Sequence, residues 1–242
     1  MGIFSTLTAD KLEETADTLG GSFDPKPTAA YDAEITLAYA GKSTKSNAQS
    51  VTVHCTIDGG EMRETIWITN GKGENFYLSK DGKNTKMPLP GFTTIDDLCL
   101  LATGDSLAEQ ATEEKTVKLY DFEARKEIPK AVEVLTGLIG KTVKLGVLRE
   151  IQDKTKQSDS GQYVATGETR VINTINKVFH AETGRTVNEY RHEIAEPEFL
   201  AAWKQRNDGK DRNRAKGAQS NGAGASGSGS PNGGSTAKKL FG

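Results

Sequence analysis

Histidines and cysteines are few in this 242-residue sequence, three and two, and neither they nor the plentiful carboxylates have the spacing of a known catalytic motif. The histidines His54, His180 and His192 have no HxxxH, HExxH or CxxC partner, so no zinc site is predicted. His54 falls in an alternating strand pattern and is interpreted as structural. The glycine-rich stretch 70–74 lacks the Gly-Lys-Ser/Thr ending of a phosphate-binding loop. We therefore expect no catalytic residue, no metal and no cofactor, and predict that the protein is not an enzyme; an enzyme acting on nucleic acid is the least favoured alternative.

Aromatic and basic side chains are interleaved in the middle of the chain, a mixture typical of proteins that bind single-stranded nucleic acid. Aromatic faces stack on bases at about 1–3 kcal/mol each, and cations follow the phosphates. The candidate nucleic-acid-binding residues are Trp67, Lys72, Phe76, Tyr77, Lys80, Lys83, Lys86, Tyr120, Phe122 and Arg125. The alternative interpretation places Trp67, Tyr120 and Phe122 in the core and leaves the lysines as solvated charges.

The charge of the chain is unevenly distributed. The net charge is -2, which excludes a uniformly basic, histone-like protein. Residues 204–242 hold eight lysines and arginines against two aspartates, a net charge of +6, which leaves -8 on residues 1–203. An acidic body does not exclude nucleic-acid binding, because only the groove must be positive.

Composition divides the chain into four segments. The body is 1–203, the basic segment 204–216, the Gly/Ser/Asn-rich linker 217–237 and the tip 238–242. The linker has no large apolar residue, so we expect it to be disordered, with a mean span of roughly 25 Å. A flexible spacer that ends in Lys238, Lys239, Leu240 and Phe241 predicts a partner-binding tip.

Hydrophobic periodicity in the body predicts a meander of short strands with few helices. Alternating apolar residues favour strands at 31–40, 49–57, 62–69, 116–124, 141–151 and 169–179. Helices are expected at 94–103, capped by Thr93 or Thr94, at 130–138 and at 197–206, with a weak helix or arm at 6–19. Residues 70–90 read as a long polar loop that holds a small hairpin. This order predicts a mainly β fold, best matched by an OB-like antiparallel barrel with a few short helices.

Two stretches of the body resemble a known family. Residues 64–73, from Glu64 to Gly73, together with Leu89-Pro90-Gly91-Phe92 and the Gly/Ser/Asn tail, resemble single-stranded DNA-binding proteins encoded by lytic bacteriophages. The resemblance implies a protein that coats single-stranded DNA without sequence preference in phage replication, recombination or transcription, in the host-cell cytoplasm. It also implies that the tip recruits replication, recombination or transcription proteins.

The tip departs from the pattern of that family. Relatives end in an acidic tip closed by a phenylalanine, whereas here Lys238 and Lys239 make the tip basic. The partner of this tip is therefore not expected to bind it in a basic pocket, as the partners of those relatives bind their acidic tips. A basic tail could instead add phosphate contacts or bind the acidic surface of the body itself.

Three further expectations bear on the class of protein. The main alternative function is a protein–protein interaction module or virion-associated β-barrel protein whose tail docks on a larger assembly. No run of eighteen apolar residues is present, so neither a transmembrane helix nor membrane association is predicted. Cys55 and Cys99 lie in apolar contexts and are expected to be buried free thiols.

Overall fold

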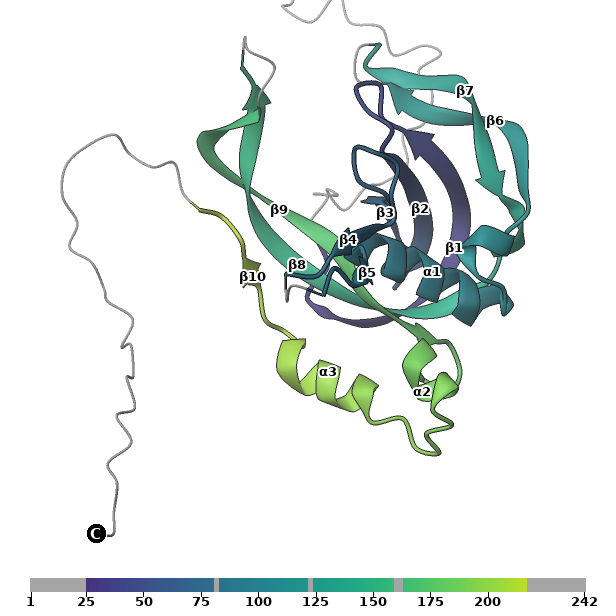
Figure 1. Cartoon of the computed structure of the whole chain (residues 1–242). Coiled ribbons are helices and arrows are strands. Elements are labelled where there is room, and N and C mark those ends of the chain that lie inside the picture. The colour runs from purple at the N-terminus through teal and green to yellow at the C-terminus, as the bar shows by residue number, and fades with distance from the viewer. Residues whose placement is uncertain (1–24, 81–82, 122–123, 159–162, 217–242) are drawn as a thin grey trace, which may run out of the picture.

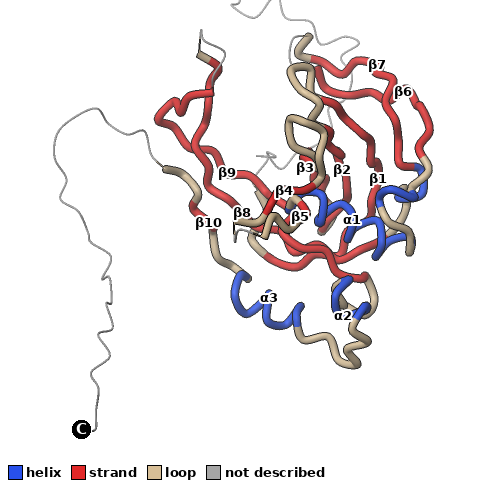
Figure 2. The backbone as a smooth tube through the Cα atoms, viewed as in Figure 1, coloured by secondary structure: helices blue, strands red, loops and turns tan. Residues whose placement is uncertain are grey.

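The computed structural model describes residues 25–80, 83–121, 124–158 and 163–216. The fold is mainly β, with strands from both halves of the chain in one large curved sheet and a few short helices around it (Figures 1 and 2). The expected arm at 6–19, the linker 217–237 and the tip 238–242 lie outside the described residues.

The first three strands form the predicted meander. They are β1 (Ala29–Lys42), β2 (Gln49–Ile57) and β3 (Gly60–Trp67), each antiparallel to the next. The tight turn between β2 and β3 places Asp58 at φ 45° and Gly59 at φ 69°. Two left-handed residues match the right-handed twist of the flanking strands, so the Asp-Gly pair closes this hairpin as expected.

Two long strands extend the sheet from the other edge of β1. β8 (Thr142–Gln157) pairs with the first half of β1 and with β9 (Tyr163–His180). The resulting order is β3-β2-β1-β8-β9. No ladder joins β3 to β9 among the described residues, so the sheet is not closed and the expected barrel is not confirmed.

Residues 112–135 form a second hairpin, and this overturns the helix expected at 130–138. β6 (Thr112–Asp121) pairs with β7 (Lys126–Leu135), and β7 joins β1 where Val134 faces Tyr39. Only Thr136–Leu138 form a turn of 3-10 helix. The physical reason is that Val132 and Val134 alternate with exposed residues at the period of a strand, and Pro129 keeps the preceding residue extended.

Helix α1 (Pro90–Thr103) confirms the expected helix but begins earlier than predicted. Pro90 occupies the first helical position, where its missing N–H costs nothing. Thr93 and Thr94 do not cap the helix; their hydroxyls donate to the carbonyls of Leu89 and Pro90. The buried face of α1, which includes Ile95, Leu98 and Cys99, packs on the main core of the sheet.

The C-terminal part of the body holds two helices and a short strand: α2 (Val187–Arg191), α3 (Phe199–Asn207) and β10 (Arg212–Asn213). The helix expected at 197–206 is confirmed, and its Trp203 is buried against Leu148 and Phe179. The sequence did not predict α2 or β10. β10 lies parallel to β8, beside Glu150 and Ile151.

The two cysteines are buried, as expected. Cys55 and Cys99 are buried free thiols, and burial raises the pKa of Cys55 to about 11 and that of Cys99 to about 12. None of the helices in the described ranges is long and apolar enough to cross a membrane.

Candidate nucleic-acid interface

A polar cleft of about 760 Å³ lies between β3 and the wall formed by β8, β9 and β10. Pro90 and Gly91, the first residues of α1, line it as well. The basic side chains that line this cleft are those of Arg63, Arg170, Arg212 and Arg214. Its lining carboxylates are Glu64 and Glu150, so the lining residues carry a net charge of +2, in a protein whose net charge is -2.

Strand alternation on β3 determines which side chains lie on its outward face. Met62 and Ile66 point into the core, so Arg63 and Thr65 point outward; the cleft runs along the edge of β3, and Glu64 and Ile66 of the inner face line it as well. Trp67 follows Thr65 by two residues and lies on the same outward face, with 50% of its surface exposed. Trp67 is therefore not a core residue, and it lies on the strand face that continues from the cleft.

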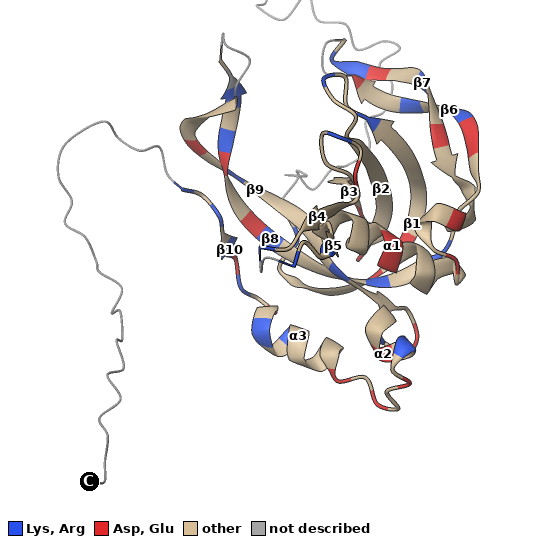
Figure 3. Ribbon diagram, in the orientation of Figure 1, with Lys and Arg blue, Asp and Glu red and all other residues tan. Residues whose placement is uncertain are grey.

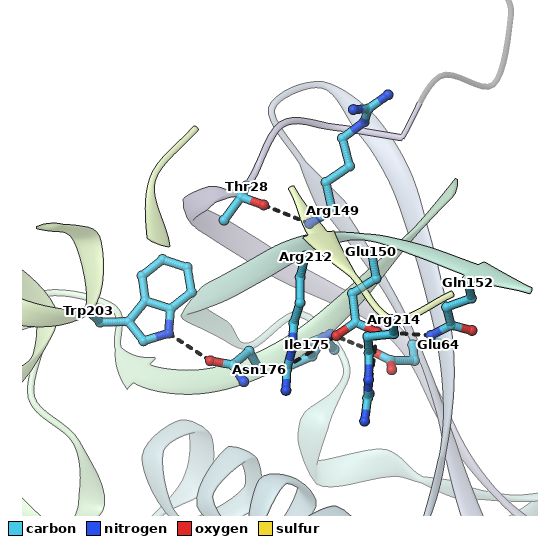
Figure 4. A network of polar contacts seen from close by, with 10 residues as sticks. All are labelled: Thr28, Glu64, Arg149, Glu150, Gln152, Ile175, Asn176, Trp203, Arg212 and Arg214. Carbon is cyan, nitrogen blue, oxygen red and sulfur yellow. Dashed lines mark hydrogen bonds and ion pairs between the residues drawn. The ribbon is translucent and has the colours of Figure 1, made fainter. Parts of the chain in front are cut away.

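Strand β10 and the residue that follows it place two arginines, Arg212 and Arg214, on the opposite wall. The backbone N–H of Arg214 donates to the carbonyl of Ile151 over 2.8 Å, which holds β10 against β8. Arg212 and Arg214 each place a guanidinium nitrogen 3.5 Å from a carboxylate oxygen of the buried Glu150 (Figure 4). Both side chains stay about half exposed, and a guanidinium has five donors, so each keeps donors for a second anion.

Glu64 lies at the point where β3 approaches β9. Its Oε2 accepts a hydrogen bond of 2.5 Å from the backbone N–H of Ile175 (Figure 4). Burial raises the pKa of Glu64 to about 7, and the nearby charge of Glu150 adds to this effect. Near neutral pH this carboxyl is therefore partly protonated, which reduces the negative charge inside the cleft.

The cleft continues past Arg63 toward the β2–β3 turn. A neighbouring hollow of about 510 Å³ shares Arg63, Ile172 and Asn173 with the cleft and adds Lys26 and Glu61. The Lys26 ammonium lies 3.3 Å from the carboxylate of Asp58. The two hollows together follow the open edge between β3 and β9.

The predicted residues of the 70–90 loop lie on a small hairpin of β4 (Phe76–Leu78) and β5 (Lys86–Pro88). The Lys86 ammonium sits 4.4 Å from the centre of the Phe76 ring, and Tyr77 is 49% exposed. β5 ends two residues before Pro90, so this hairpin adjoins the α1 end of the cleft. Lys72 is exposed before this hairpin, and Lys80 and Lys83 are exposed between its two strands.

The remaining predicted residues are not brought into this cleft. Tyr120 and Arg125 are exposed at the end of the β6–β7 hairpin and are not among the residues that line the cleft. Their role stays a prediction. Phe122 and the tip residues Lys238, Lys239, Leu240 and Phe241 lie outside the described residues.

His54 lies on the outer face of β2, opposite Arg63. Its ring centre is 5.8 Å from that of Tyr39. Burial is the main cause that lowers the pKa of His54, and the charge of Arg63 lowers it further.

No group of three His, Cys, Asp or Glu side chains within the described ranges could hold a metal ion.

Sequence reasoning missed all four cleft arginines. Arg63 lies on the expected strand 62–69 but was not among the candidate residues. Arg170 lies on the expected strand 169–179 but was not a candidate either. Arg212 and Arg214 belong to the basic segment 204–216, for which no strand was predicted. The alternation Arg212-Asn213-Arg214 is the signal that could have indicated a strand with two cations on one side.

Comparison of the chain with family models, curated proteins and solved structures found no match. The function must therefore be inferred from the cleft and its surroundings.

Proposed function

We propose that this protein binds single-stranded DNA without sequence preference and that the cleft between β3 and the β8–β9–β10 wall holds the strand. The observation that carries the proposal is the gathering of Arg63, Arg170, Arg212 and Arg214 in one cleft, beside the half-exposed Trp67. Guanidinium groups bind phosphates with several donors at once, and an exposed indole stacks on any base.

The path of the strand follows from the same residues. Phosphates lie along the arginines of β3, β9 and β10, and a base stacks on Trp67. Beyond Trp67 the strand reaches the β4–β5 hairpin, where Tyr77 offers a second exposed ring and Lys72, Lys80, Lys83 and Lys86 supply further cations. These contacts read the backbone and the π-face shared by all bases, so binding is independent of sequence.

The strand order supports an OB-like assignment for the body. An OB-fold has five strands in a partly open barrel and binds oligonucleotides on the face of its second and third strands. Here β3-β2-β1-β8-β9 are the five strands, with α1 between β3 and β8 in the chain. Arg63, Thr65 and Trp67 occupy the outward face of the third strand, where that fold would place the ligand.

In this account the protein coats single-stranded DNA during phage replication, recombination or transcription, in the cytoplasm of the host cell. It does so without catalysis. The tip at 238–242 is the segment available for contacts with other proteins.

The test is a fluorescence titration of the full chain with an oligo(dT) strand and with a duplex of equal length, at several salt concentrations. We expect quenching of tryptophan emission, preference for the single strand, and affinity that falls steeply with salt. Absence of binding to oligo(dT) at low salt would contradict the proposal and favour the protein-interaction alternative.

A further inference from the structure

An apolar groove lies between α2 and α3 and shares no lining residue with the cleft. It has a volume of about 530 Å³, and its apolar lining includes Ile194, Phe199 and Ala202. Ile194 and Phe199 keep 41% and 48% of their surface exposed. Two large apolar side chains thus line one hollow without being covered by the described part of the chain.

The lining of this groove includes Glu189 and Glu198 against one lysine, Lys177, whose ammonium is paired with Asp97, and the segment that surrounds the groove is acidic. Residues 182–202 contain five glutamates against two arginines, a net charge of -3. Glu193, Glu196 and Glu198 are exposed on the connector between α2 and α3, whereas basic residues lie along β10 (Figure 3). An occupant of this groove should therefore carry large apolar side chains next to positive charges.

We propose that the groove between α2 and α3 is the docking site of the chain's own segment Lys238–Phe241. Leu240 and Phe241 supply two large apolar side chains, and Lys238 and Lys239 supply two positive charges opposite the glutamates. The linker 217–237 has no charged and no large apolar residue, so nothing in it competes for the groove.

The linker is long enough for this contact. Lys216, where the linker begins, lies 17 residues after Phe199 in the groove, and part of that stretch is the compact helix α3. The linker that must lead back to the groove has 21 residues, so it can span this separation. A flexible tether of this kind gives an effective concentration on the order of millimolar. Exposed ion pairs are weak, so docking of this type is readily reversible and weakened by salt.

The tip therefore stays bound to the body until another protein binds it more tightly. The groove and the cleft share no lining residue, so the tip and the nucleic acid occupy different sites on the body.

The test compares backbone amide NMR spectra of the full chain and of the variant Leu240→Ala/Phe241→Ala at low salt. We expect amide signals of residues 188–202 to differ between the two, with the cleft residues unchanged. Glu196→Gln/Glu198→Gln should weaken docking about two- to fivefold for each ion pair lost. The matched control Glu113→Gln/Glu114→Gln, on exposed β6, should leave the spectrum of residues 188–202 as in the wild type.

Identical spectra for the wild type and the Leu240→Ala/Phe241→Ala variant would overturn the proposal, as would differences confined to Arg170, Arg212 and their neighbours. A dilution series identifies the source of the tip. Signals that do not change on dilution support docking of the chain's own tip. Signals that revert on dilution would overturn it in favour of the tip of a second copy.

Discussion

Glu64 on β3 accepts a hydrogen bond from the backbone N–H of Ile175 on β9, and thereby bridges two strands that no ladder joins in the described part of the sheet. In a closed barrel, a backbone carbonyl of the neighbouring strand would accept the hydrogen bond from the N–H of Ile175. Here the side chain of Glu64 accepts it instead. Because burial raises the pKa of Glu64 to about 7, this bridge is also sensitive to pH.

The stability of the protein should fall as the pH rises from about 4.5 to about 7. The folded state holds the proton of Glu64 more tightly than the unfolded chain does, so deprotonation costs up to about 3 kcal/mol of folding free energy. In Glu64→Gln the amide oxygen still accepts from Ile175 and no charge is buried. We expect this variant to be more stable than the wild type at pH 8 and similar to it at pH 4.5, measured by urea unfolding. Equal stability of the two proteins at pH 8 would contradict this reading of Glu64.

The fluorescence of Trp67 should change when DNA binds, and its ring should contribute to the affinity. The chain has two tryptophans, and Trp203 is buried, so Trp203→Phe leaves Trp67 as the sole indole reporter. We expect oligo(dT) to quench its emission. Trp67→Ala should weaken binding by about 1–3 kcal/mol, because one stacked base loses its platform. An unquenched Trp67 in a complex that still forms would show that the strand does not cross this end of β3.

Tyr77 on the β4–β5 hairpin should extend the stacking surface. Tyr77→Ala should weaken binding to oligo(dT) by about 1–3 kcal/mol, whereas the matched variant Tyr77→Phe, which keeps the ring, should bind like the wild type. Phe76→Ala should also weaken binding, since the Phe76 ring positions Lys86. Wild-type affinity in both alanine variants would remove this hairpin from the site.

Gly91 should be intolerant of any side chain. A Cβ atom at Gly91 would lie 2.1 Å from the carbonyl oxygen of Trp67, so α1 would have to move away from β3. We expect Gly91→Ala to destabilise the fold by about 1–3 kcal/mol in thermal or urea unfolding. Gly71→Ala, whose added Cβ would lie 3.8 Å from that of Ser46, is the matched control and should be close to neutral.

Local patterns were enough to predict most strands and the two longer helices. Alternation identified β1, β2, β3, β8 and β9, and Asp58-Gly59 identified the turn between β2 and β3. The helix expected at 130–138 was wrong because a short run of apolar residues that ends at Gly137 fits either period. Pairing with β6 makes this run a strand. The pairing of distant strands, on which barrel closure depends, is not encoded in any local pattern.

The candidate site was only partly predictable for the same reason. Trp67 and the residues of the 70–90 loop stood out because aromatic and basic residues are neighbours in sequence there. Arg63, Arg170 and Arg212 come from three strands, and only the sheet brings them to one cleft. Glu150 gave no signal in the sequence, since its burial between Arg212 and Arg214 depends on the parallel pairing of β10 with β8.

The most direct test of the central claim is the salt dependence of oligo(dT) binding by Arg63→Gln/Arg170→Gln, two cleft cations without an ion pair among the described residues. We expect weaker binding and a slope of log K against log salt that is less steep by about 1.4, since each lost phosphate contact removes about 0.7 from the slope for a single strand. Lys204→Gln/Arg206→Gln, an exposed basic pair on α3 outside the cleft, is the matched control and should keep the wild-type slope. Equal slopes for the wild type and the cleft variant would contradict the assignment of this cleft as the DNA-binding site.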